Sequence, residues 1–297
     1  MKQLKDLWRR AFLWRLTIYA FVFCLALAII FPASWLHRDF PWGPGTDKSG
    51  HQEHPTAPSG SAPASPEELA SISGSIPFAG HRIPLPAGTW HPLVAANGGL
   101  QGSQEALSLV RIDQNIVTGV IMLGADTHPL TRPALESEFN LCDGTGNYVS
   151  QSSKVTSPDG TKECWFLAPS RTSHRAGPQD FPAIIGDELD RLGIPYPALF
   201  VQARWVHAAP GTTGTWYPTV MSIFLAPNES GSLRLIAPLS SWNVRDFAAD
   251  RRVRSFIGRT QSWFDNWVTI LRNAMRNGMA GPSLPIRKGN RDPAYPA

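Results

Sequence analysis

An uninterrupted apolar segment near the amino end, residues 16–36, constrains this chain more than any other feature. At about 1.5 Å of rise per helical residue the segment reaches roughly 30 Å, which matches the hydrocarbon core of a bilayer. Acidic and basic residues balance just after the segment, whereas the residues before it are mainly basic, namely Lys2, Lys5, Arg9, Arg10 and Arg15. Because positive flanks stay in the cytoplasm, we expect one transmembrane helix with residues 1–15 inside and the rest of the chain outside.

A cleaved signal peptide is the alternative interpretation, since it also begins with a basic region followed by an apolar one. The apolar segment is longer than the roughly 7 to 15 residues typical of such peptides, and Pro32-Ala33-Ser34 at its far edge is a poor cleavage site. The pair Arg9-Arg10 resembles a twin-arginine export signal, but a basic membrane flank explains it. We therefore expect an uncleaved signal-anchor in a bacterial inner membrane and a periplasmic domain.

The chain after the anchor divides by composition into four parts. Residues 37–76 are rich in Pro, Gly and Ser and lack a hydrophobic period, so we expect a linker that does not fold. Residues 77–240 have the length of one globular domain, 241–278 predict an amphipathic helix, and 279–297 predict a disordered tail. The net charge of +4 comes from basic residues at both ends, whereas a nucleic-acid binder carries them on its folded body, so we expect no nucleic-acid partner.

Alternating apolar and polar residues between 77 and 240 predict mostly β structure. Segments 106–112 and 116–123 flank the turn sequence Asp113-Gln114-Asn115 and predict a β-hairpin. A second hairpin is predicted from segments 199–207 and 216–225, and a shorter strand pair around the cysteines has its second strand at 163–168. Within segment 199–207, we expect one alternating set to face the core, namely Val201, Ala203, Trp205 and His207.

Start and stop signals predict a helix from Asp180 to Arg191, with Pro182 in its first turn and Gly193 at its exit. Its predicted apolar face, which would lie across the sheet, consists of Ile184, Ile185, Leu189 and Leu192. The sequence thus predicts an α+β fold. It is a mainly antiparallel sheet with a packed helix and a long C-terminal amphipathic helix, preceded by one transmembrane helix.

The C-terminal helix predicted over 241–278 is basic, with arginines from Arg245 to Arg276 and a break or kink at Gly258. It cannot span a membrane, because an arginine at the bilayer centre costs about 2.5 kcal/mol or more. Three interpretations stay open. The apolar stripe docks on the domain, or the helix lies on the lipid bilayer surface, or it contacts an envelope protein partner.

Two of the three cysteines, Cys142 and Cys164, fall in the predicted extracytoplasmic domain, whereas Cys24 lies in the apolar segment. Outside the cytoplasm such a pair indicates a disulfide bond. Closing a loop of this length contributes about 3 kcal/mol in the chain-entropy model. A cysteine nucleophile is the alternative, but no histidine adjoins either cysteine in the sequence.

The sequence contains no Gly-rich phosphate loop, paired-histidine zinc motif, Gly-x-Ser-x-Gly elbow or paired Cys-x-x-Cys motif. We therefore expect no cofactor and no metal, and we favour a binding or structural role over an enzymatic one. The alternative is an exported hydrolase whose site lies near Asp126 and His128. These residues lie in a loop after a predicted strand, where they could act as a base and its orienting group.

A strand opening of the form Leu-Pro-x-Gly-x-Trp occurs at residues 85–90, followed by Gly193-Ile194-Pro195 at the helix exit and a Trp-rich terminal helix. In these short motifs the chain resembles an uncharacterised type of exported or membrane-tethered protein of Gram-negative bacteria. The resemblance covers residues 83–278. It implies an extracytoplasmic compartment and transfers no functional residue.

Overall fold

The computed structural model describes residues 70–98, 104–153, 159–172, 181–212, 214–280 and 290–295. They form an α+β fold with a mainly antiparallel sheet and a long C-terminal helix, as predicted. Within this described part of the chain, no helix is both long and apolar enough to cross a membrane. The predicted transmembrane segment 16–36 lies outside the described residues, so the anchor stays a prediction.

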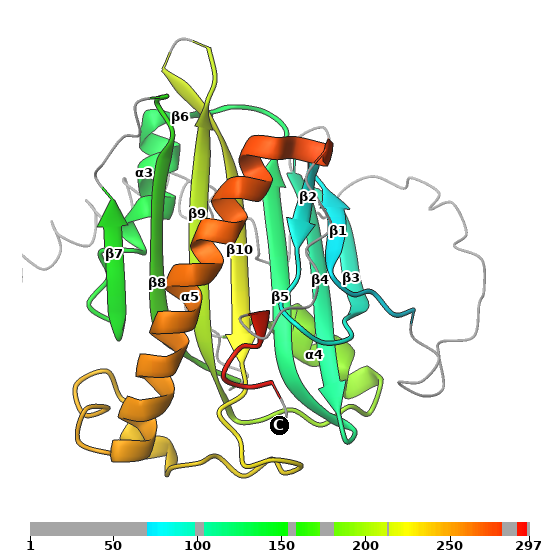
Figure 1. Ribbon diagram of the computed structural model, residues 1–297, viewed down its shortest axis with the longest axis vertical. Helices are drawn as coiled ribbons and strands as arrows, with labels where there is room; N and C mark the ends of the chain where they lie inside the picture. The colour runs from blue at the N-terminus through cyan, green and yellow to red at the C-terminus, as the bar shows by residue number, and fades with distance from the viewer. Residues whose placement is uncertain are drawn as a thin grey trace, which may run out of the picture. The chain divides into compact units, whose positions relative to one another are not determined.

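One eight-stranded antiparallel sheet organises the fold (Figure 1). Its strand order is β3-β4-β5-β10-β9-β8-β7, and the short strand β6 pairs with one end of β10. Two meanders build the sheet, and each starts at an edge and ends at the centre, where β5 pairs with β10. The strands are β3 (His91–Gly98), β4 (Gln104–Asp113), β5 (Ile116–Asp126), β6 (Leu130–Thr131), β7 (Val149–Ser153), β8 (Lys162–Arg171), β9 (Leu199–Pro210) and β10 (Thr215–Leu225).

One face of the sheet is covered by elements from the two ends of the described chain (Figure 1). Helix α5 (Arg251–Asn277) crosses strands β8 to β10, and the hairpin of β1 (Ser75–Phe78) and β2 (His81–Pro84) lies beside it. The helix, the hairpin and the sheet share one hydrophobic cluster, which includes Phe264 and Trp267 of α5. The Phe264 ring meets Trp165 of β8 edge to face, with 5.6 Å between the ring centroids.

Two shorter helices cover the opposite face of the sheet, α3 (Arg132–Asn140) and α4 (Ala183–Arg191). Helix α4 buries Ile185 and Leu189 in a cluster with Phe224 of β10. Phe139 of α3 packs against a smaller cluster that contains Cys142 and Cys164. The sheet is therefore the middle layer of three.

Both predicted hairpins are confirmed. Strands β4 and β5 meet at a turn whose central residues, Gln114 and Asn115, have φ of 49° and 61°. Positive φ at both positions is the signature of the type I′ turn, whose twist matches that of the flanking strands. The turn chemistry thus fixes the register of this first hairpin. Strands β9 and β10 form the second hairpin, from Leu225 opposite Val201 to Trp216 opposite Pro210.

The prediction that one alternating set of β9 faces the core is incomplete, because both faces of this strand are buried. Val201 and Trp205 pack in the cluster under α5, as predicted. Phe200 and Val206 of the other set are also fully buried, in the clusters of the opposite face. The alternation within this one strand does not show that helices cover both faces of the sheet, because its second set of residues includes a polar residue, Arg204.

The predicted helix near 180–191 is present as α4, but its start and one of its apolar residues differ from the prediction. Pro182 occupies the N-cap position, and Asp180 lies outside the described residues. Ile185 and Leu189 are buried as predicted, whereas the Ile184 side chain is 53% exposed. Neighbouring helical residues point about 100° apart, so a short helix that buries Ile185 turns Ile184 toward solvent.

The long C-terminal helix is present but begins at Arg251 rather than at 241. Residues Leu239–Trp242 form the short 3-10 helix η4, turns follow, and Asp250 caps α5 by accepting a 2.8 Å hydrogen bond from the Arg252 backbone. The helix runs through Gly258 without a break, so the break predicted there is absent. Because α5 buries its apolar stripe on the sheet, the docking interpretation is the one that accounts for that stripe.

Two predicted boundaries also need correction. The fold starts within the predicted linker, because Ile72 bridges Trp90 and β1 begins at Ser75. The tail predicted to be disordered from 279 onward is structured in part. A 3-10 helix η5 (Gly278–Ala280) follows α5, and Asn290 and Asp292 are buried. The composition of this tail does not indicate that Asp292 is buried and fixes residues 290–295 to the domain.

Candidate functional site

The predicted hydrolase residues, Asp126 and His128, lie at the end of β5 and in the loop that follows it. Asp126 ends β5, and burial raises the pKa of its carboxyl group although Gln104 donates a hydrogen bond to it. His128 is exposed, and its Nδ1 lies 3.3 Å from Thr127 Oγ1. No hydrogen bond or ion pair is found between these two described residues, and the hydrolase site stays a prediction.

The predicted disulfide between Cys142 and Cys164 is confirmed. Cys142 follows α3 and Cys164 lies on β8, with their Cα atoms 6.3 Å apart. Both residues are buried against Phe166 and Val206. Because the two sulfur atoms are bonded to each other, neither is a thiolate, and the cysteine-nucleophile alternative does not apply to this state of the protein.

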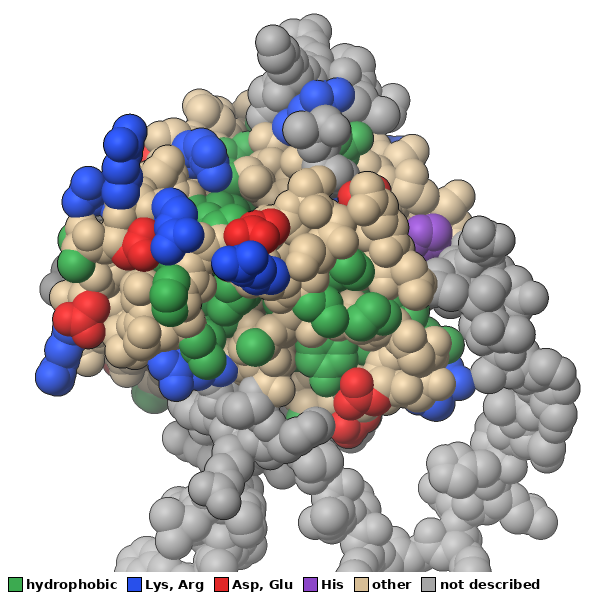
Figure 2. All heavy atoms as spheres, turned by 90° about the horizontal axis from the view of Figure 1, so that it is seen from below, with side chains coloured by type: hydrophobic (Ala, Val, Ile, Leu, Met, Phe, Trp, Pro, Cys, Tyr) green, Lys and Arg blue, Asp and Glu red, His purple; other side chains and the backbone are tan. Residues whose placement is uncertain are grey.

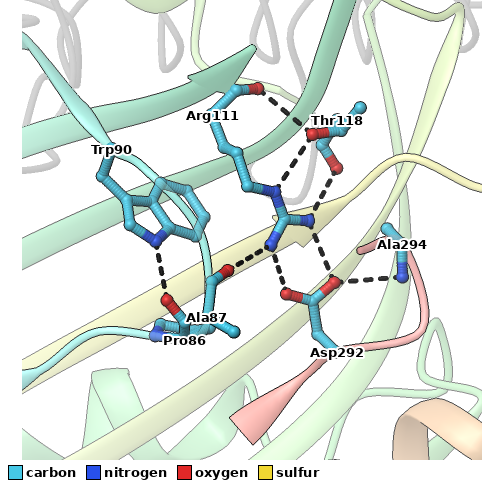
Figure 3. A network of polar contacts seen from close by, with 7 residues as sticks. All are labelled: Pro86, Ala87, Trp90, Arg111, Thr118, Asp292 and Ala294. Atoms are coloured by element: carbon cyan, nitrogen blue, oxygen red, sulfur yellow. Dashed lines mark hydrogen bonds and ion pairs between the residues drawn. The ribbon is translucent and has the colours of Figure 1, made fainter. Parts of the chain in front are cut away.

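Arg111 of β4 is a buried arginine at the centre of a polar network (Figure 3). Its Nε donates to Thr118 Oγ1 at 3.0 Å, and its Nη1 donates to the Ala87 carbonyl at 3.1 Å. Its guanidinium carbon lies 5.0 Å from the centre of the Trp90 ring. We call Arg111 together with Ala87, Trp90 and Thr118 the Arg111 cradle.

Asp292 pairs with the Arg111 guanidinium from the far end of the chain (Figure 3). Its Oδ2 lies 2.5 Å from Nη1 and its Oδ1 lies 3.0 Å from Nη2, a bidentate arrangement. The side chains of Arg111 and Asp292 are 3% and 0% exposed. Asp292 belongs to residues 290–295, which we call the C-terminal strap. The network therefore joins the strap to the first meander.

Two glycines leave the space that Arg111 needs. A Cβ atom on Gly88 would lie 2.8 Å from Arg111 Cδ, and its φ of +120° is one that other residues rarely adopt. A Cβ atom on Gly119 would lie 3.1 Å from the Trp90 ring and 3.3 Å from Arg111 Nη2. Trp90 is held in turn by a 2.9 Å hydrogen bond from its Nε1 to the Pro86 carbonyl. The motif at residues 85–90 thus builds one wall of the cradle.

A second polar cluster joins α5 and β2 to the sheet. Glu163 of β8 accepts hydrogen bonds from Arg272 of α5, with Nε 2.8 Å from Oε1 and 2.9 Å from Oε2. His207 of β9 places Nδ1 4.0 Å from Glu163 Oε2, and its ring stacks on Trp205. His81 of β2 is close enough to His207 for the two to interact electrostatically. We call Glu163, Arg272, His207 and His81 the Glu163 cluster.

Burial and charge shift two groups of the Glu163 cluster. Burial raises the pKa of Glu163, but interactions with His207 and Arg272 outweigh it and hold that pKa below its ordinary value. Burial lowers the pKa of His81, and the neighbouring His207 lowers it further, although a hydrogen bond with the Met275 backbone opposes the shift. The cluster therefore favours an ionised glutamate and a neutral His81 in the folded protein.

The two sites differ in what they can do chemically. The Arg111 cradle binds a carboxylate with a planar, bidentate fork, whereas the Glu163 cluster responds to protons. No group of three or more His, Cys, Asp or Glu side chains in the described part of the chain could hold a metal ion. Reasoning from the sequence identified neither site. Two signals for the cradle were available, because Arg111 directly follows the buried residues Leu109 and Val110 of its strand and the motif at residues 85–90 contributes Ala87 and Trp90.

Replacing Asp292 by Asn should lower the free energy of unfolding by about 3 to 5 kcal/mol, because Arg111 would then be a buried charge without its counterion. Urea unfolding of the purified chain measures this change. Asp265→Asn on the exposed face of α5 is the matched control, and it should shift stability by about 0.5 kcal/mol or less. Equal effects of the two variants would contradict the assigned role of Asp292.

His81 should make the protein less stable in mild acid. Because folding depresses its pKa below the ordinary 6.5, the unfolded chain binds the proton more readily. The stability that neutral His81 allows is fully present above pH 6.5 and is lost as the pH falls below that value. The stability that ionised Glu163 contributes is lost only below pH 4.5, the ordinary pKa of a glutamate. Between pH 7.5 and pH 5, the melting temperature should fall less for His81→Gln than for the unchanged chain. The exposed His128→Gln is the control. If the melting temperature of His81→Gln falls as much in acid as that of the unchanged chain, the assignment is refuted.

Both sites tie distant segments of the chain together, and in one of them, the Arg111 cradle, an arginine holds a carboxylate in a bidentate arrangement. No protein-family model, no curated protein and no solved structure matches this chain. The residues of the chain itself are therefore the ground for a functional proposal.

Proposed function

We propose that this chain is a single-pass protein of a bacterial inner membrane, with its N-terminus in the cytoplasm and a periplasmic domain that has a binding or structural role. The observation that carries the proposal is the buried disulfide between Cys142 and Cys164. Disulfide bonds form and persist in oxidising compartments and are rare in the cytoplasm. A domain built around one is therefore suited to the far side of the membrane that residues 16–36 are predicted to span.

The exposed face of α5 supports a contact with an envelope protein. Arg251, Arg252, Arg254, Arg259 and Arg276 are exposed along it. At the end of the molecule where α5 begins, basic side chains are interspersed with acidic and apolar ones (Figure 2). Mixed charges weaken the attraction to an anionic lipid surface, whereas polar and apolar groups side by side are typical of protein interfaces. We therefore favour a protein partner over lipid headgroups for the N-terminal end of this helix.

Cysteine labelling of the full chain tests the compartment and the anchor together. The chain has three cysteines, and one of them, Cys24, lies in the predicted anchor. Rapid denaturation with a maleimide and no reductant should modify Cys24 alone, and reduction beforehand should expose Cys142 and Cys164 as well. Mass spectrometry of the intact chain counts the modified thiols. The double variant Cys142→Ala with Cys164→Ala is the control, because it should show one modified thiol under both conditions.

Each other labelling pattern contradicts a specific part of the proposal. Three modified thiols without reductant would place the domain in a reducing compartment. No modified thiol before reduction and two afterwards would show that the mature chain begins beyond Cys24 and has no anchor.

Reversing charges on α5 tests the partner surface. Arg251→Glu combined with Arg259→Glu should abolish co-purification of an envelope protein in mild detergent, because the contact would meet repulsion instead of attraction. The fold should be unaffected, since Arg251 lies in the first turn of α5, where the helix dipole favours a negative charge, and Arg259 is an exposed residue of the same helix. Arg132→Glu on the exposed start of α3 is the control. The same bound proteins in all three preparations would contradict the assigned surface.

A further inference from the structure

We propose that the Arg111 cradle is a recognition site for aspartate-bearing peptide segments, and that the C-terminal strap is its resident ligand. This inference deepens the proposed function, because it assigns a ligand class to the proposed binding domain. It can be tested on the purified chain whatever the compartment of the domain.

The cradle is complete without the strap. Ala87 and Trp90 come from the connection between β2 and β3, and Arg111 and Thr118 lie on paired strands. Each has a partner within this region. Arg111 donates to Ala87 and Thr118, and Trp90 donates to Pro86. The guanidinium is therefore held in place by the first meander, and its Nη1 and Nη2 are aimed at the position of the Asp292 carboxylate (Figure 3).

The strap meets the cradle with backbone, charge and ring contacts together. The Ala87 amide donates to the Asn290 carbonyl at 3.0 Å, which fixes where the incoming segment begins. The Asp292 carboxylate takes the bidentate position on Arg111. The Tyr295 ring lies with its centre 5.5 Å from the guanidinium carbon. A backbone contact, a side-chain charge and an aromatic ring at fixed spacing are the elements by which a protein recognises a peptide sequence.

The strap is organised by its own residues, as a separable ligand must be. Asp292 Oδ1 accepts a hydrogen bond from the Ala294 amide at 3.0 Å, and the Asp292 carbonyl accepts one from the Tyr295 amide at 3.0 Å. Pro293 occupies the second position of this turn, where its fixed φ is favourable. Because these bonds lie within four residues, a free peptide of this sequence needs little ordering to adopt the bound shape.

The burial of Arg111 makes the cradle selective for a carboxylate. With the strap in place Arg111 is 3% exposed, so an uncharged segment at the position of Asp292 would leave a buried guanidinium without a counterion. Nine residues, 281–289, connect η5 to the strap. A connection this short holds the strap at an effective concentration on the order of millimolar. In the intact chain, a free aspartate-bearing peptide of the same affinity must therefore exceed this effective concentration to displace the strap.

A peptide-binding measurement on the full chain in detergent tests the proposal. The probe is a dye-labelled, C-terminally amidated peptide, Asn-Arg-Asp-Pro-Ala-Tyr, and the readout is fluorescence anisotropy. The full chain with Asp292→Asn should bind this peptide at least tenfold more tightly than the unchanged chain does. A probe with Asn in place of its Asp should bind at least tenfold more weakly, and adding Arg111→Met to the chain should abolish binding. Equal binding of the Asp and Asn probes would overturn the proposal.

A second variant keeps the test decisive if Asp292→Asn does not fold. A protease site placed within residues 281–289 allows the strap of an otherwise unchanged chain to be cut after folding. The labelled peptide should then exchange into the cut chain and not into the uncut one, while the circular dichroism of the domain stays constant. Failure to exchange, or unfolding on exchange, would show that the strap is an integral part of the fold. The cysteine labelling is unaffected by this result, so the two proposals can fail separately.

Discussion

A buried arginine must have a counterion, and in this protein that requirement links the first meander to the end of the chain. Arg111 is enclosed by Trp90 and by hydrogen bonds to Ala87 and Thr118, and its charge is balanced by Asp292. Replacing such a pair with apolar residues often costs little, whereas removing one partner is strongly destabilising. The pair therefore acts less as a source of stability than as a condition for the strap to be in place.

The C-terminal part of the chain holds the two meanders together. Within the sheet they meet at one junction, the pairing of β5 with β10. Outside the sheet, α5 packs on the second meander, contacts β2 and places Arg272 on Glu163 of β8. The strap that follows α5 then returns to Arg111 on the first meander. Residues after 250 thus connect the two meanders on the face of the sheet that α5 covers.

The parts of the fold that were predictable from the sequence are those set by local chemistry. Asn115 is a residue that tolerates positive φ, and the Asp113-Gln114-Asn115 sequence lies between two β-rich segments, so the first hairpin could be placed with its turn. The spacing of Cys142 and Cys164 and their predicted compartment were enough to indicate the disulfide.

What could not be predicted depends on contacts between residues distant in sequence. Asp292 lies 181 residues from Arg111, and a lone aspartate in a proline-containing tail has no local pattern that marks it as buried. Helix α3 was missed for a related reason, because it buries Leu135 alone and lacks an apolar stripe. The second covered face of β9 escaped as well, since one strand's alternation carries no information about what lies above and below the sheet.

The two faces of the sheet are closed by bonds of different kinds, and this difference bears on where function resides. On the face covered by α3, the disulfide joins Cys142 to β8 covalently and opens only by reduction. On the face covered by α5, the strap is held by an ion pair and hydrogen bonds, which can break and reform without any chemical reagent. The binding role that we propose requires a surface whose contacts can exchange. The α5 face, which holds both the Arg111 cradle and the proton-responsive Glu163 cluster, has such contacts.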